Sequence, residues 1–216
     1  MTELRHLLDQ LEAAAGAPEP LPSSDGWELV LAENIAYLVS DEQRWAALDD
    51  LRRAVGTEPE QILAAPHELL EGVVAGLRPA ERIARLRRCA ELAIAGAPWR
   101  AFPGIGKPGA ERIELFTSSR TVLPLDSNGL RVLTRLGYSD STLSYGASYR
   151  TAQAAASSAL PHSVVSFQRA YLLLRRHGQA VCGRRDPACA VCPIAAAVRA
   201  PGALHRCTNA DRAACS

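Results

Sequence analysis

The amino-acid sequence predicts an all-α fold. Three observations favour helices over strands: alanine and leucine dominate the composition, runs of β-branched residues are short, and the polar–apolar alternation typical of strands is nearly absent. The chain has 216 residues, of which 48% are hydrophobic. It is therefore long and apolar enough to fold into one large domain or two smaller helical lobes, and it is not disordered.

Helix boundaries follow from capping residues, prolines and glycines. Ser24 or Asp25 caps the first predicted helix, and prolines begin or precede several later ones, where a proline in the first turn costs no hydrogen bond. Gly137 and Gly178 end two others. The predicted helices span 27–39, 41–55, 59–65, 67–75, 79–95, 109–116, 127–136 and 164–177. From residue 182 onward we expect a cysteine-rich loop.

Charge is distributed unevenly along the chain. Residues 1–99 contain 9 arginines, no lysine and 17 acidic residues, which gives a formal charge of −8. Residues 100–216 contain 14 arginines, one lysine and 6 acidic residues, which gives +9. A basic half suits phosphate groups, so the distribution favours a nucleic-acid partner, the alternative being that the two halves simply attract one another.

Membrane and secretory segments are not predicted. Arginine, glutamate, glycine or proline interrupts every apolar run before it reaches the length of a membrane span. Residues 1–20 contain acidic residues and an arginine, and they lack the apolar core of a signal peptide. We therefore expect a cytoplasmic protein with no membrane partner.

A glycine hairpin is the most informative stretch, and residues 102–113 read FPGIGKPGAERI. Gly104 and Gly106 permit the positive φ angles that a tight reversal requires. Ile105, between them, is placed to fill the space between two helices. An ordinary glycine turn is the alternative to a functional hairpin.

The helix after the hairpin is expected to bind DNA through its first turn. Its first N–H groups, including that of Gly109, face outward and suit a DNA phosphate, helped by the helix dipole and by the nearby Lys107. Ala110 permits close helix packing, and Ile113 falls on the same face. The stretch resembles the helix-hairpin-helix motif, in which two glycines alternate with apolar residues and are followed by alanine and a further apolar residue.

Asp126 lies in a second informative segment, residues 125–137, which read LDSNGLRVLTRLG. Leucines at helical spacing follow Asp126, so it occupies the position of an N-cap. The segment resembles the endonuclease III pattern, in which Val-Asp-Thr-His leads into a helix containing Arg-Val and Arg-Leu-Gly. With the hairpin, it is similar to the endonuclease III-like helix-hairpin-helix DNA glycosylase superfamily. In that family the aspartate activates a nucleophile or stabilises positive charge on the sugar as the base departs.

The resemblance fails at the catalytic lysine. Endonuclease III proteins place it two residues after the second hairpin glycine, where this chain has Pro108. Lys107, the only lysine in the chain, lies one residue earlier, about 100° around the helix. We therefore expect Lys107 to contact phosphate rather than to form a Schiff base. Lyase activity of Lys107 in a distorted hairpin is the alternative.

Two further positions align with functional residues of the superfamily. Residues 31–42 match the helix and loop that carry an intercalating glutamine in the superfamily. In this chain Leu38 stands at the position of that glutamine, with Tyr37 beside it. An apolar side chain at this position can fill the space left by a flipped base. Glu33 matches a catalytic glutamate of the related adenine and mismatch glycosylases, where a buried carboxyl can protonate the departing base. A surface glutamate on an amphipathic helix is the alternative for Glu33.

Three closely spaced cysteines form a candidate metal site. Cys182, Cys189 and Cys192 resemble the start of the iron–sulfur loop of these glycosylases, Cys-x6-Cys-x2-Cys-x5-Cys. The fourth position of that pattern is Val198 here. The resemblance implies a [4Fe–4S] cluster, which requires four thiolates.

The fourth ligand must then come from further along the chain. Cys207 is favoured over Cys215 because it lies closer to the loop. Zinc bound by the same ligands, with His205 as a possible member, is an alternative, and so is a loop without metal. Arg184 and Arg185 lie inside the loop and are expected to contact phosphate in every case.

The resemblance covers most of the chain, from about residue 27 to residue 192. It implies a two-lobed helix-hairpin-helix glycosylase fold: a six-helix barrel over residues 25–138, and a second lobe of residues 1–24 and 139–216 with the iron–sulfur loop. It further implies a monomeric, nucleoid-associated, monofunctional DNA glycosylase that acts on double-stranded DNA. It would cleave the N-glycosidic bond of a damaged or mispaired base. The alternative is a catalytically degenerate protein that recognises damaged or structured DNA without base excision.

Overall fold

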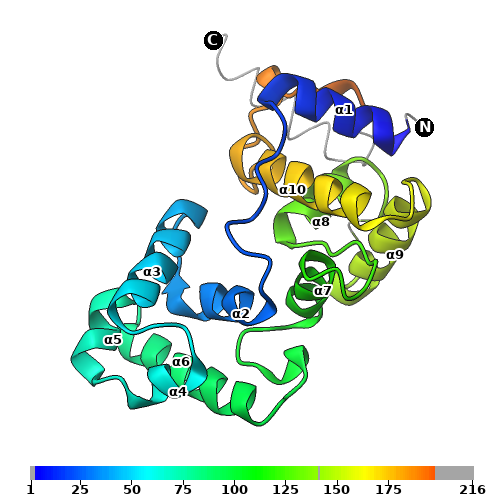
Figure 1. Ribbon diagram of the computed structural model, residues 1–216. Coiled ribbons are helices and arrows are strands. Elements are labelled where there is room, and N and C mark those ends of the chain that lie inside the picture. Colours follow the sequence, from blue (N-terminus) through cyan, green and yellow to red (C-terminus); the bar gives the residue numbers. More distant parts are fainter. Residues whose placement is uncertain (1–2, 141, 198–216) are drawn as a thin grey trace. The chain divides into compact units, whose positions relative to one another are not determined.

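The computed structural model describes residues 3–140 and 142–197, and their regular structure is almost entirely helical (Figure 1). The all-α prediction is thereby confirmed. The chain divides into two compact units. Unit 1 consists of residues 1–20 and 118–216, and unit 2 consists of residues 21–117.

Unit 2 lies wholly within the described residues and contains six α-helices and one pair of two-residue strands. The strands, β1 (Ala36–Tyr37) and β2 (Ala75–Gly76), pair in parallel. The helices are α2 (Gly26–Ile35), α3 (Asp41–Ala54), α4 (Pro59–Ala64), α5 (His67–Val73), α6 (Pro79–Ile94) and α7 (Lys107–Phe116), with the short 3₁₀ helix η1 (Trp99–Ala101) before α7.

Helix α2 is the centre of unit 2. It packs against α3, α6 and α7, and it is apolar on nearly all sides, as expected of a helix surrounded by others. Leu29, Val30 and Leu31 are fully buried. The surrounding helices complete the core with Leu48, Leu51, Ile62, Leu70 and Leu86.

The helix starts of unit 2 follow the predicted capping chemistry. Asp25 caps α2 by accepting a hydrogen bond of 2.9 Å from the Glu28 N–H. Ser40 caps α3 in a capping box with Gln43. Pro59 and Pro79 stand in the first turns of α4 and α6. Local side-chain chemistry therefore fixed these boundaries.

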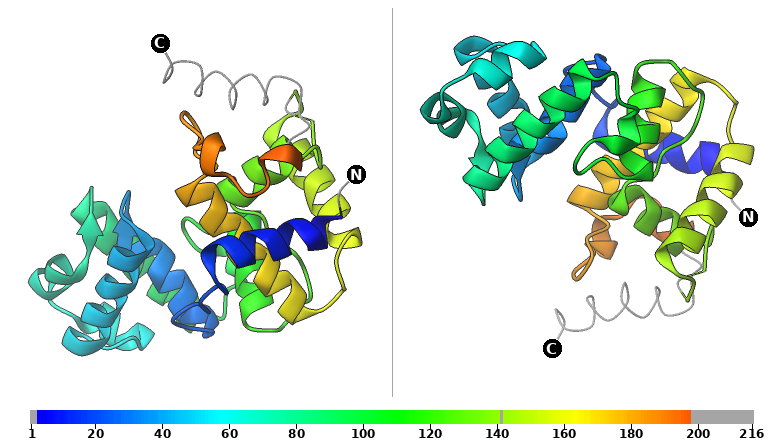
Figure 2. Two further views of the ribbon diagram at one scale, coloured as in Figure 1. Left: turned by 90° about the horizontal axis from the view of Figure 1, so that it is seen from above. Right: turned by 90° about the horizontal axis from the view of Figure 1, so that it is seen from below.

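Unit 1 is built around α10 (Val164–Ala180), which contacts both α1 (Leu4–Ala15) and α8 (Ser127–Arg135) (Figures 1 and 2). Helix α9 (Tyr145–Ser158) packs on α8. Two 3₁₀ helices, η2 (Cys189–Val191) and η3 (Ala195–Ala197), follow α10. Because α8 buries its apolar face in unit 1, residues 118–138 lie outside unit 2, whereas we expected them in the barrel.

Helices α1 and α9 were not predicted. Helix α1 buries four leucines at helical spacing and is held to α10 by Arg169, which donates to Asp9 at 2.8 Å and to Glu12 at 2.6 Å. Its buried leucines are Leu4, Leu7, Leu8 and Leu11. Helix α9 is rich in alanine and serine and buries only small residues and Tyr149, so its sequence carries no strong apolar stripe.

The core of unit 2 provides a stability test. We expect Leu48→Ala to lower the free energy of unfolding by about 2–5 kcal/mol, because Leu48 is fully buried and its removal leaves a cavity. Leu69→Ala is the matched control, since Leu69 lies on α5 with 47% of its surface exposed, and we expect a loss of about 0.5 kcal/mol or less. Urea denaturation of the two variants measures both values. Equal losses would show that the core is not placed as described.

Candidate nucleic-acid interface and active site

The predicted hairpin is present in unit 2, between η1 and α7. Gly104 has φ +75°, the left-handed conformation that favours glycine, and the Ile105 N–H closes the turn on the Phe102 carbonyl at 3.1 Å. Ile105 is buried as predicted. The prediction for Gly106 is wrong in one respect: its φ is −76° and its conformation extended, because it is the N-cap of α7.

The first turn of α7 is arranged as the hairpin motif requires. The first hydrogen bond of the helix runs from the Ala110 N–H to the Gly106 carbonyl at 3.0 Å, so the N–H of Gly109 precedes the intrahelical ladder. Pro108 stands in this turn and has no N–H to leave unpaired. An added Cβ at Gly109 would lie 3.4 Å from Ile105, an ordinary contact, so the packing of this turn on the hairpin does not itself require glycine.

Lys107 and Glu33 both take part in ion pairs of unit 2. The Lys107 ammonium lies 3.6 Å from the buried Glu111 carboxylate on the same helix. Glu33 pairs with Arg112 of α7 at 3.2 Å, and 35% of the Glu33 side chain is exposed. The expectation of a buried carboxyl at Glu33 is therefore wrong.

The predicted wedge lies directly after β1. Leu38 has φ +57° and 73% of its surface exposed. Tyr37 is less exposed, because the Arg82 guanidinium lies over its ring, 5.1 Å from the centroid. Leu77, which follows β2, is also exposed and donates its N–H to the Tyr37 carbonyl at 3.3 Å.

Sequence analysis did not identify Leu77. Leu38 and Leu77 each come directly after a residue of the Tyr37–Gly76 strand pair, so two exposed leucines stand at the same end of the pair. The sequence feature that could have indicated Leu77 is the position of an apolar residue in a predicted turn, between Gly76 and Pro79.

In unit 1, Asp126 is the N-cap of α8, as predicted. Its Oδ1 accepts a hydrogen bond of 2.7 Å from the Gly129 N–H. Its Oδ2 accepts one of 3.2 Å from the Asn128 side-chain amide, and Arg175 of α10 forms an ion pair with the same oxygen. The carboxylate is thus held through both oxygens.

Tyr145, at the start of α9, is a further residue near Asp126 that the sequence did not indicate. Burial of its hydroxyl, and in second place the charge of Asp126, raise the pKa of Tyr145. Its side chain is nevertheless largely exposed.

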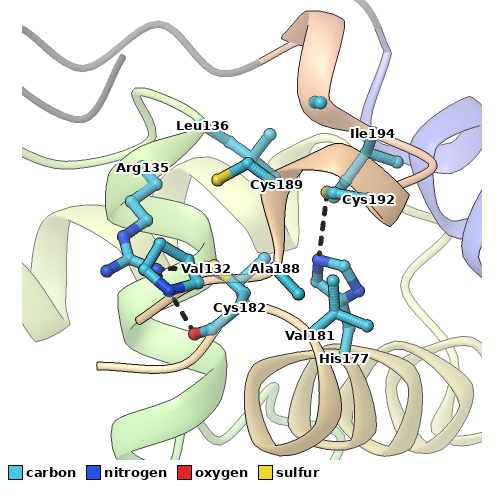
Figure 3. Close-up of a pocket in the computed structure, with 12 residues that line it drawn as sticks. Val132, Arg135, Leu136, His177, Val181, Cys182, Ala188, Cys189, Cys192 and Ile194 are labelled. Carbon is cyan, nitrogen blue, oxygen red and sulfur yellow. Dashed lines mark hydrogen bonds between the residues drawn. The ribbon is translucent and has the colours of Figure 1, made fainter. Parts of the chain in front are cut away.

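Two arginines of α8 hold the loop that begins at Cys182. Arg131 donates to the Gly178 carbonyl at 2.7 Å and to the Cys182 carbonyl at 2.9 Å. Arg135 donates to the Gly183 carbonyl and to the Cys182 sulfur, both at 2.9 Å, and Figure 3 shows its side chain beside Cys182. Main-chain carbonyl groups therefore receive most of these hydrogen bonds.

The three loop cysteines line one pocket with His177 (Figure 3). Cys192 Sγ lies 3.6 Å from His177 Nε2. Burial lowers the pKa of His177 to about 4 and raises that of the Cys192 thiol. Arg184 and Arg185 are exposed at the loop surface.

These cysteines have the chemistry of metal ligands, but their placement is not that of a formed site. Within residues 3–140 and 142–197, no three histidine, cysteine, aspartate or glutamate side chains are positioned to hold a metal ion. Cys207, the expected fourth ligand, lies outside the described residues. Cys89, by contrast, is buried in unit 2, where burial raises its pKa to about 12, as expected of an inert thiol.

The fold of this chain is similar to the folds of solved protein structures. A non-covalent endonuclease III–DNA complex matches with a TM-score of 0.72 at 17% identity over 100% of both chains. The fold is that of endonuclease III. The estranged-adenine complex of a trapped endonuclease III–DNA covalent intermediate also matches, with a TM-score of 0.70 at 18% identity over 99% of each chain. A thermostable thymine-DNA glycosylase matches with a TM-score of 0.69 at 18% identity over 97% of this chain and 95% of that one.

The endonuclease III fold is what this chain shares with those proteins at such low identity. No protein-family model matches the sequence, and no curated protein matches it significantly. The expected helix-hairpin-helix glycosylase fold is confirmed by the structural matches. Among the described helices, none combines the length and the apolar character needed to cross a membrane.

Proposed function

We propose that this chain is a DNA glycosylase that binds double-stranded DNA as a monomer and hydrolyses the N-glycosidic bond of a damaged or mispaired base. The observation that carries the proposal is Asp126, a carboxylate fixed at the start of α8 in a chain with the endonuclease III fold. Matching structures of that fold are complexes with DNA. A cytoplasmic, nucleoid-associated location belongs to the same proposal.

DNA binding is assigned to the hairpin and to exposed basic residues. The start of α7 presents N–H groups and the positive end of a helix dipole to one phosphate. Lys107 adds a cation beside this turn, although it also pairs with Glu111. Arg184 and Arg185 provide further phosphate contacts from unit 1.

Base flipping is assigned to the wedge of Leu38, supported by Tyr37 and Leu77. An exposed leucine on a turn can enter the space that a flipped base leaves, and apolar side chains serve this role in other DNA-binding proteins. The left-handed backbone of Leu38 is strained for a leucine, which fits a residue held outward for a function.

The chemistry is assigned to Asp126. As the base departs with the electron pair of the N-glycosidic bond, positive charge develops on the sugar, and an ionised carboxylate stabilises that charge. A water molecule then adds to the sugar carbon, and its proton passes to the carboxylate. Pro108 stands where a Schiff-base lysine would be needed, so the products are a free base and an intact abasic strand.

Binding without excision is the second candidate function. It is favoured by one observation, the ion pair between Arg175 and Asp126. A carboxylate whose charge is balanced by a guanidinium stabilises a cationic sugar less well. Glu33 is partly exposed and paired with Arg112, so it gives less support to a second catalytic carboxyl than we expected from the sequence.

The glycosylase proposal is tested with a panel of duplexes that carry different lesions and mismatches, treated with alkali to reveal abasic sites. We expect the wild-type protein to release one class of base, and Asp126→Asn to lower the single-turnover rate by about 10²–10⁴-fold. Asparagine still caps a helix, so the variant is expected to fold and to bind DNA. Asp140→Asn, at an exposed position of unit 1, should leave the rate unchanged.

Binding to duplex DNA without release of any base from the panel would favour the second candidate. Borohydride treatment of the protein with abasic DNA is expected to yield no covalent adduct. An adduct that disappears in Lys107→Ala would instead establish lyase activity at Lys107.

The role of the hairpin in DNA binding is tested with two glycine-to-alanine variants that introduce the same kind of backbone strain. Gly104 and Gly96 both have positive φ, at +75° and +65°, so alanine at either position costs about 1–2 kcal/mol. We expect Gly104→Ala to weaken duplex binding by about tenfold, because the hairpin shifts, and Gly96→Ala to leave it unchanged. Fluorescence anisotropy with a labelled duplex measures both. Equal affinities of the two variants for the duplex would show that the hairpin is not part of the DNA interface.

For the cysteine loop we propose a [4Fe–4S] cluster ligated by Cys182, Cys189, Cys192 and Cys207. Support comes from the spacing of the first three and from their positions around one pocket. When bound, such a cluster would serve as a cross-link that holds the loop, as thiolate-ligated clusters do. Its formation requires reduction of the disulfide at Cys189 and movement of the sulfur atoms, because Cys189 is not a free thiol and the described residues do not hold the three sulfur atoms at one point.

The cluster is tested by metal analysis of anaerobically purified protein. We expect about four iron atoms per chain together with a visible thiolate–iron absorbance band, and we expect both to be lost in Cys192→Ser. Cys89→Ala is the control and should retain the metal, since Cys89 is buried in unit 2. Stoichiometric zinc would favour the zinc alternative, and protein without iron or zinc would refute a metal at this loop.

A further inference from the structure

Arg175 is placed against Asp126 by tight packing between α8 and α10. A Cβ added to Gly178 would lie 2.7 Å from Asn128 Cβ, and one added to Gly129 would lie 3.6 Å from Leu174 Cβ. The absence of a side chain at Gly178 lets the first turn of α8 approach α10 closely, whereas a Cβ at Gly129 would make only an ordinary contact. Arg175, next to Leu174 in the chain, is thereby brought to the Asp126 carboxylate.

The resulting contact is largely removed from solvent. Only 21% of the Arg175 side chain and 18% of the Asp126 side chain are exposed. Charge-assisted hydrogen bonds between a guanidinium and a carboxylate are among the stronger polar contacts in proteins. The pair is therefore a defined feature of unit 1 and not a loose surface contact.

The contact opposes the chemistry assigned to Asp126. Its Oδ1 is engaged by the Gly129 N–H and its Oδ2 by Asn128 and Arg175. The same carboxylate must stabilise a positive charge on the sugar, and a guanidinium in contact with it reduces its capacity to do so. Arg131 of the same helix donates to the Asn128 side-chain oxygen at 2.8 Å and adds further positive charge beside this turn.

We propose that Arg175 restrains Asp126: the guanidinium neutralises the carboxylate, and it must leave Oδ2 before Asp126 can act. This inference rests on the proposed glycosylase function. It predicts that the base-release step is slower than it would be if Asp126 had no ion pair with Arg175. It also predicts that the restraint depends on the positive charge of residue 175 and not on its bulk.

The first arm of the test measures the reactivity of Asp126 without any enzymatic assay. A water-soluble carbodiimide activates a carboxylate, and glycinamide then forms an amide with release of a urea; peptide mass spectrometry gives the labelling rate at Asp126. We expect Arg175→Met to raise this rate about tenfold and Arg175→Lys, which keeps the charge, to stay near wild type. Arg176→Met is the matched control, since Arg176 bonds the Gly16 and Ala17 carbonyls instead, and it should not change the rate.

The second arm uses the lesion panel under single-turnover conditions. We expect Arg175→Met to release the base about tenfold faster than wild type, and Arg175→Lys and Arg176→Met to match the wild type. Slower release by Arg175→Met would overturn the proposal, because Arg175 would then assist Asp126.

The two arms separate the failure of this inference from failure of the proposed function. Unchanged labelling in Arg175→Met would refute the restraint whatever the lesion panel gives. Faster labelling, with no base released by any variant, would support the restraint and refute the glycosylase proposal.

Discussion

The close approach of α8 to α10 determines the geometry of unit 1. Gly178 has no side chain, and the Asn128 backbone occupies the space that a Cβ would need. As a result the N-terminus of α8, with Asp126, faces the middle of α10, while Arg131 one turn later reaches the end of α10. One steric condition therefore places both the candidate catalytic carboxylate and the arginines that hold the cysteine loop.

This arrangement joins features that would otherwise appear independent. Asp126 caps α8, Arg131 bonds both Asn128 and the Cys182 carbonyl, and Arg135 reaches the Cys182 sulfur. The carboxylate and the loop are thus connected through the first turns of a single helix. A change in the conformation of the cysteine loop would therefore alter the surroundings of the Asp126 carboxylate through contiguous hydrogen bonds, and not only through long-range electrostatic interactions.

Features governed by local chemistry could be predicted from the sequence. The caps at Asp25 and Asp126, and the reversal at Gly104, depend on residues within a few positions of each other. The ion pairs of Asp126 with Arg175 and of Glu33 with Arg112 could not, because they join residues 49 and 79 positions apart. Helix orientation decides such pairs, and a single sequence does not contain it.

The hydrogen bonds from α8 to the cysteine loop affect which sequence changes this loop can tolerate. Arg131 and Arg135 direct most of their hydrogen bonds to carbonyl groups of the main chain, from Gly178 to Gly183. Carbonyl groups are present whatever residues the loop carries, so the path of this segment is independent of most of its side chains. Replacement of a cysteine in this loop by another residue would therefore leave these hydrogen bonds, and the backbone path that they hold, in place.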